Sequence, residues 1–111
     1  MYGFAAIDCN GRVADNTVIR ALRWAPGTRL DIRESGGLVL VRADQQGVFC
    51  TSGQGYLRLP AAVRHWCGLR PGDRVLLAAD ADHGLLVVHP PAALDAMVTQ
   101  FHADVLGGDA R

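Results

Sequence analysis

Arginine is the residue type in this chain whose placement could do chemistry. The 111-residue sequence has 11 basic residues, and all of them are Arg rather than Lys. A guanidinium group binds phosphate oxygens and guanine edges through paired hydrogen bonds. Codon bias in a GC-rich genome is the favoured explanation of the missing Lys, so only the positions of the arginines bear on function.

Other chemistry finds little support in the sequence. Cys9, Cys50 and Cys67 have no paired spacing, which favours reduced thiols over a disulfide framework or a zinc site. No nucleophile motif, glycine-rich phosphate loop or acid pair stands out. We therefore expect no metal, no cofactor and no enzymatic activity.

The overall charge is balanced, because 11 acidic residues offset the 11 basic ones. Any positive field must therefore come from clustering of arginines rather than from an excess. The alternative is a solvated β-surface whose charges pair with one another, as in the run Arg29, Asp31 and Arg33. The N-terminus does not resemble a signal peptide and no stretch is long enough to span a membrane, so we expect a cytoplasmic protein.

A pattern in the first half of the chain returns in the second half. The stretch GRVADNTVIRALRWAPGTRLDI, from residue 11 to 32, corresponds to GYLRLPAAVRHWCGLRPGDRVLL, from 55 to 77, after a one-residue gap near Trp24. The later strand GGLVLVR likewise corresponds to HGLLVVH. Such a repeat indicates a unit that was duplicated. We place the first copy at about residues 2–44 and the second at about 46–90.

Each copy has the pattern of strand, strand, helix, strand, strand. The alternation in TRLDIRE predicts a strand with Leu30 and Ile32 on one side, and the spacing of NTVIRALRW and AAVRHWCG predicts two short helices. Asp15 or Asn16 can cap the first helix. The two tryptophans, Trp24 and Trp66, end these helices, and we expect both to cap the core.

A unit of about forty residues is near the lower limit for independent folding. It would leave an apolar face and open strand edges that need a cover. We therefore expect residues 1–90 to form one domain in which the copies cover each other about an approximate twofold axis.

The repeat resembles the AbrB/MazE/SpoVT family of swapped-hairpin transcription factors and antitoxins. The second copy carries the resemblance best, with a Leu-Pro before the helix, Val-Arg within it, and the run Gly-Leu…Gly-Asp after it. The first copy keeps the Gly-Arg-Val turn, Ile-Arg and Pro-Gly, but has ADN for the Leu-Pro and Trp24 where the Gly of Leu-Gly would stand. The resemblance implies a mainly β fold with short helices, a swapped-hairpin β-barrel made here by one chain as a pseudo-dimer.

The resemblance also implies a function. Family members bind double-stranded DNA through basic residues at the first hairpin and the helix start, which correspond to Arg12, Arg20 and Arg64 here. Arg23, Arg58, Tyr56 and His65 lie near these positions. We expect a bacterial transcriptional regulator that associates with the nucleoid when bound to DNA. The alternative is an antitoxin-like or scaffold module that binds a toxin or another protein.

The C-terminal segment differs from the repeat. It begins at two prolines, and its pattern predicts an amphipathic helix over residues 91–106 followed by a loose tail over 107–111. The helix either packs on its own barrel or pairs with another chain, and we slightly favour a homodimer. The expected interface residues are Leu94, Met97, Val98, Phe101 and Val105.

Overall fold

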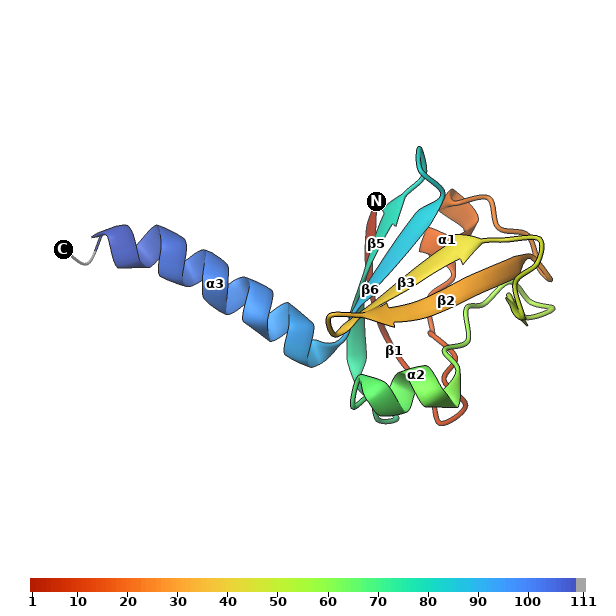
Figure 1. Ribbon diagram of the computed structural model, residues 1–111, viewed down its shortest axis with the longest axis horizontal. Helices are drawn as coiled ribbons and strands as arrows, with labels where there is room; N and C mark the ends of the chain where they lie inside the picture. The colour runs from red at the N-terminus through yellow and green to blue at the C-terminus, as the bar shows by residue number, and fades with distance from the viewer. Residues whose placement is uncertain (110–111) are drawn as a thin grey trace.

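The computed structural model describes residues 1–109 as one six-stranded antiparallel sheet, two short helices and one long helix (Figure 1). The strands are β1 (Tyr2–Ala6), β2 (Arg29–Ser35), β3 (Leu38–Ala43), β4 (Phe49–Cys50), β5 (Arg74–Asp80) and β6 (Leu85–His89). The helices are α1 (Thr17–Ala21), α2 (Ala61–Trp66) and α3 (Pro91–Asp109). The expected mainly β class with a C-terminal helix is confirmed.

The strand order, β1-β5-β6-β3-β2-β4, shows that the two halves of the chain exchange strands. The hairpins β2–β3 and β5–β6 meet at the centre through β3 and β6. β1, from the first half, pairs with β5 of the second, and β4, from the second half, pairs with β2 of the first. Each half therefore completes the sheet of the other.

The two exchanged strands have the same register on their partners. In β1, Ala5 lies opposite Val75, and in β4 the corresponding residue, Phe49, lies opposite Leu30. Just beyond these strands, Ile7 N–H donates to the Asp73 carbonyl at 2.9 Å and Thr51 N–H donates to the Thr28 carbonyl at 3.0 Å. The halves of the chain are thus related by an approximate twofold arrangement of their backbones.

The sheet is open, and the expected closed β-barrel is therefore not confirmed. β1 and β4 are its edges. The second strand of each copy, expected near residues 12–15 and 56–60, contributes only isolated bridges, Ile7 to Val13 and Arg12 to Arg58. The reason is local: side-chain oxygens of Asp8 and Ser52 accept backbone N–H groups of the turns that follow, and such bonds compete with a ladder.

One apolar core joins both halves. The alternation of β2 is confirmed, because Leu30 and Ile32 are buried while Arg29 and Arg33 are exposed. The helices enter the same core through Val18, Ile19 and Val63. Burial of such aliphatic side chains, each contributing about 1.5–3 kcal/mol, is what holds the exchanged halves together.

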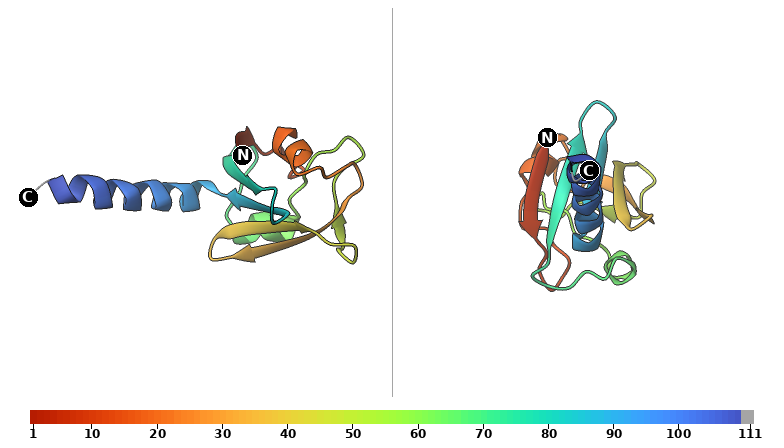
Figure 2. Two further views of the ribbon diagram at one scale, coloured as in Figure 1. Left: turned by 90° about the horizontal axis from the view of Figure 1, so that it is seen from above. Right: turned by 90° about the vertical axis from the view of Figure 1, so that its left-hand side faces the viewer.

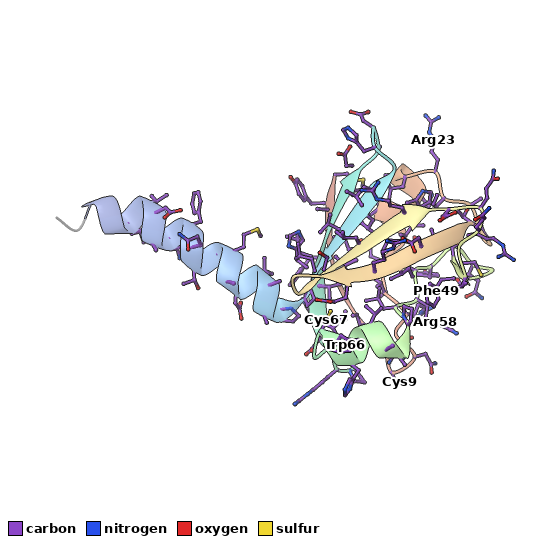
Figure 3. The ribbon with its side chains drawn as sticks, viewed as in Figure 1. Cys9, Arg23, Phe49, Arg58, Trp66 and Cys67 are labelled. Atoms are coloured by element: carbon purple, nitrogen blue, oxygen red, sulfur yellow. The ribbon has the colours of Figure 1, made fainter. Side chains whose placement is uncertain are left out.

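The prediction for the tryptophans is right for one and wrong for the other. Trp24 is 6% exposed, whereas Trp66 is 76% exposed. In the second half, Leu69 fills the place of Trp24: Trp24 N–H donates to the Ile19 carbonyl, and Leu69 N–H donates to the Arg64 carbonyl. Trp66 ends α2 outside this core, as Figure 3 shows.

The ends of the helices also differ from the predictions. α1 and α2 are shorter than the stretches 16–24 and 61–68, and Asp15 rather than Asn16 supplies the cap, with Thr17 N–H donating to Asp15 Oδ1 at 2.7 Å. α3 continues to Asp109, so residues 107–109 of the expected loose tail are helical, and residues 110–111 lie outside the described residues. Within residues 1–109, no helix has the length and apolar character needed to cross a membrane.

Candidate nucleic-acid interface

The structure divides the predicted DNA-binding residues into two groups. The first group, called the central cluster here, consists of Arg12, Tyr56, Arg58 and Arg64 and lies where the two halves meet. The second group, Arg20 and Arg23, lies at the end of α1. Figure 3 shows Arg58 near α2 and Arg23 well apart from it.

Arg12 and Arg58 face each other across the boundary between the halves. They are partners in an isolated antiparallel bridge. The bridge is fixed by a bond from Val13 N–H to the Leu57 carbonyl at 2.9 Å and another from Leu59 N–H to the Gly11 carbonyl at 2.8 Å. Like charges placed directly opposite each other on paired strands are unfavourable, so this pairing costs stability unless a negative charge lies nearby.

Tyr56 and Asp8 hold the guanidinium of Arg12. The Arg12 Cζ lies 4.6 Å from the centroid of the Tyr56 ring, a cation–π contact. Arg12 Nε lies 3.4 Å from Asp8 Oδ2, and this buried nitrogen has no hydrogen-bond partner among the described residues. The side chain is therefore oriented by stacking and charge rather than by hydrogen bonds to the protein.

Asp8 is a structural anion in the turn that presents Arg12. Its Oδ1 accepts the N–H groups of Asn10 and Arg12, both at 2.9 Å. The bond from Arg12 N–H, followed by that from Asn10 and by the positive charges of Arg12 and Arg58, holds the pKa of Asp8 below its ordinary value. Asp8 offsets only part of the positive charge of the cluster, because no described carboxylate forms an ion pair with Arg58 or Arg64.

Arg64 braces this turn from α2. Its Nε donates to the Leu59 carbonyl at 3.0 Å, and one terminal nitrogen donates to the Cys9 carbonyl at 3.4 Å. Gly11, at φ +83°, lies directly under this side chain: a Cβ there would collide with the Leu59 carbonyl oxygen and lie 2.6 Å from Arg64 Nε. Glycine is therefore required at position 11 both by the turn and by the close approach of Arg64.

Arg20 and Arg23 line a hollow beside α1. This hollow has a volume of about 510 Å³. Its remaining lining comes from α1, the segment after it, and the turn at residues 52–55: Asn16, Trp24, Ala25, Pro26, Gln54 and Gly55. α1 thus adjoins the turn of the second half, in the same way that α2 adjoins the turn of the first.

The backbone of Arg23 has an unusual conformation that the sequence did not disclose. Its φ is +61°, the only positive value at a non-glycine among the described residues. Gly68, at φ +64°, is its counterpart in the second half. The Gly of the family's Leu-Gly pair is therefore replaced by Arg23, and the expectation that Trp24 replaces it was wrong by one residue, because the gap falls before Arg23.

Two further expectations concern residues near the clusters. His65 is exposed in the last turn of α2. The alternative of a solvated, paired surface applies to Arg33, whose Nε lies 2.7 Å from Asp31 Oδ2. Arg33 is therefore a useful contrast to the central cluster.

The cysteines are free thiols among the described residues. Cys9 and Cys50 are exposed, and Cys67 is half-buried. Burial, and to a lesser degree the charge of Glu34, raises the pKa of the Cys67 thiol above its ordinary value. At neutral pH this thiol is therefore protonated. In residues 1–109 no three His, Cys, Asp or Glu side chains gather as a metal site would require.

Comparison of the chain with protein-family models, with curated proteins and with solved structures finds no match. The candidate interface therefore rests on its own geometry: arginines from both halves of the chain, held by a tyrosine ring, a turn and a helix.

Proposed function

We propose that this protein binds double-stranded DNA through the central cluster and acts as a transcriptional regulator. Phosphate contacts supply most of the affinity of such proteins, and arginine forms them well. The observation that carries the proposal is the bridge between Arg12 and Arg58. A phosphate oxygen beside this pair would relieve the repulsion between the two guanidiniums.

The proposal includes an AbrB-like swapped-hairpin arrangement formed within one chain. The exchange of β1 and β4 between the halves and their matched register support it. A fused pair can diverge, and here Tyr56 stands in the second copy where Arg12 stands in the first. The contact surface is accordingly asymmetric, with a basic side chain stacked on an aromatic one.

Arg20 and Arg23 extend the proposed contact surface away from the central cluster. Both side chains are exposed, and neither forms an ion pair within the described part of the chain. His65 adds a donor at the end of α2. These residues contact neighbouring phosphates if the DNA runs across both helices.

The test is a binding titration by fluorescence anisotropy with a duplex from the upstream region of the gene, at several salt concentrations. The double variant Arg12→Gln and Arg58→Gln should weaken binding at least tenfold and reduce the slope of log K against log salt by about 2, since each lost phosphate contact removes about 0.9. The matched control is Arg33→Gln, which removes one charge from an ion-paired arginine. Equal binding by the double variant and the wild type would contradict the proposal.

A further inference from the structure

The outer face of the sheet, turned away from the core, carries a continuous row of apolar side chains. Residues paired across a β-ladder point to the same face. The row crosses four strands through Tyr2, Ala78, Val87 and Leu40. Phe4 and Leu76 are paired beside it. Tyr2 is 76% exposed and Phe4 is 53% exposed, although a sheet face that meets only water usually carries polar side chains.

A hollow deepens this face at the edge of the sheet. It has a volume of about 500 Å³, and its lining is mixed, with Tyr2, Leu85 and Val87 on one hand and the carboxylates of Asp80 and Asp82 on the other. β1, which carries Tyr2 and Phe4, is also an edge strand. No further strand of the described sheet pairs with its outer side. The outer face itself, between this hollow and β3, is therefore an apolar surface that no part of residues 1–109 covers.

The same chain carries a second uncovered apolar surface, on α3. Leu94, Val98, Phe101 and Val105 recur at the spacing of one helix face, with Met97 beside them. Phe101 is 64% exposed. Figures 1 and 2 show α3 leaving the sheet, which it contacts only near its beginning. Leu106 is also exposed but lies away from this stripe, so α3 is not apolar on one face alone.

α3 cannot cover the outer face of its own sheet. Only Pro90 separates the end of β6 at His89 from the first residue of α3, Pro91. The Pro90 carbonyl accepts the N–H of Leu94 at 2.9 Å, and Pro90 itself is buried. Two consecutive prolines with fixed φ leave no loop in which the chain could reverse its direction.

The charges of the two surfaces are complementary. α3 carries exposed Asp95 and Asp104 and has no Arg or Lys. The outer face carries exposed Arg42 and Arg74, which form no ion pair among the described residues, and the Arg74 Cζ lies 6.0 Å from the centre of the Phe4 ring. Two acids of this face already have partners: Asp31 is paired with Arg33, and Asp80 with His83.

We propose that a second copy of this chain supplies the cover: α3 of each protomer packs across the outer sheet face of the other. Phe101 packs against the exposed rings of Tyr2 and Phe4 of the partner, and the helix carboxylates approach Arg42 and Arg74 of the partner. Such reciprocal contacts form a closed twofold dimer, in which both unpartnered surfaces are buried. This interface is separate from the central cluster and does not depend on DNA binding.

The experiment measures the mass of the purified full chain by sedimentation velocity across a concentration series. The wild type should be a dimer. Phe101→Asp on α3, and Tyr2→Asp with Phe4→Asp on the sheet, should each raise the dissociation constant at least tenfold. The matched control is Thr99→Asp, an exposed position on the opposite side of α3, which should leave the dimer intact. All these side chains are exposed, and circular dichroism checks that each variant is folded.

Mixing the two variants gives the sharpest result. A mixed dimer of Phe101→Asp with Tyr2→Asp and Phe4→Asp has one contact with both variant surfaces and one that is entirely wild type, so equimolar mixing should partly restore the dimer. A monomeric wild type would overturn the proposal. So would a dimer that Phe101→Asp dissociates and the sheet variant does not, because that result assigns the contact to a pair of α3 helices.

Discussion

At the scale of single residues, Arg23 combines a strained backbone with an exposed charged side chain. A φ of +61° costs an ordinary residue about 1 kcal/mol relative to glycine, and the equivalent position in the other half is a glycine. A strained residue at a surface that carries other arginines indicates that the side chain has been kept for a purpose other than stability.

Replacement of Arg23 by glycine should therefore separate stability from binding. We expect Arg23→Gly to raise the free energy of unfolding by about 1 kcal/mol, because the strain is removed. The same variant should bind DNA more weakly, because one cation is lost from the proposed surface. Urea unfolding followed by tryptophan fluorescence measures the first effect and an anisotropy titration the second.

The control for this prediction lies in the second half of the chain. Gly68→Ala, at φ +64°, should lower the free energy of unfolding by a similar amount, about 1 kcal/mol. If Arg23→Gly destabilises the fold instead, the side chain of Arg23 makes a stabilising contact that outweighs its backbone strain.

At the scale of elements, each turn is tied to the helix of the opposite half. Arg64 of α2 bonds to the carbonyl of Cys9, while Arg20 of α1 lines the hollow bounded by Gln54 and Gly55. The two contacts are equivalent in position but unequal in closeness. This difference can be measured, because each turn has a glycine at the same place and nearly the same φ.

Gly11→Ala should cost far more stability than Gly55→Ala. Both glycines have a φ near +82°, at +83° and +82°, so both substitutions carry the backbone strain of about 1 kcal/mol. Only at Gly11 would the added Cβ also collide with the Leu59 carbonyl and displace Arg64, whereas the nearest atom at Gly55 is Pro26 Cγ at 3.8 Å. We expect a loss of about 3 kcal/mol or more at Gly11 in urea unfolding. Equal losses at the two sites would show that the Arg64 brace is not rigid.

The cap of α1 gives a pH-dependent prediction. Hydrogen bonds from the hydroxyl and N–H of Thr17 hold the pKa of Asp15 below its ordinary value of 3.8. A lowered pKa means that the stabilisation is present above pH 3.8 and is lost as the pH falls through the lower folded value. Asp15→Ala should cost about 1 kcal/mol at pH 7, and the gap to the wild type should narrow as the pH is lowered below 3.8.

The matched control for the cap is Asn16→Ala. The side chain of Asn16 makes no capping bond, so its removal should change the free energy of unfolding by less than about 0.5 kcal/mol. Urea unfolding of the wild type and both variants, at pH 7 and at acid pH, measures these differences. A gap between Asp15→Ala and the wild type that stays constant with pH would contradict the assignment of the cap.

The sequence predicted the individual strands and helices more reliably than the way in which the strands join into a sheet. Alternation placed Leu30 and Ile32 in the core, and the spacing of apolar residues located both helices. The open sheet was missed, because the bonds that Asp8 and Ser52 make to their own turns are not visible in a hydrophobic pattern. Likewise, the sequence proposed Arg12 and Arg58 separately, but their pairing depends on the exchange of strands between halves.

At the scale of the whole molecule, the duplication has two consequences. The halves share one core, so the fold should unfold in a single transition rather than half by half. The chain also presents two separate surfaces, with the central cluster at the boundary of the halves and the apolar face on the outer side of the sheet. A dimer formed through the latter would carry two central clusters, and their linkage would strengthen binding to a DNA site that both can reach.

The most direct test of the central claim is a map of amide chemical shifts during titration of the labelled protein with duplex DNA. We predict that the largest changes fall at Arg12, Tyr56, Arg58 and Arg64, with smaller ones at Arg20 and Arg23, and that they diminish as salt rises. Absence of changes at saturating DNA, or changes confined to the outer sheet face and α3, would contradict the account.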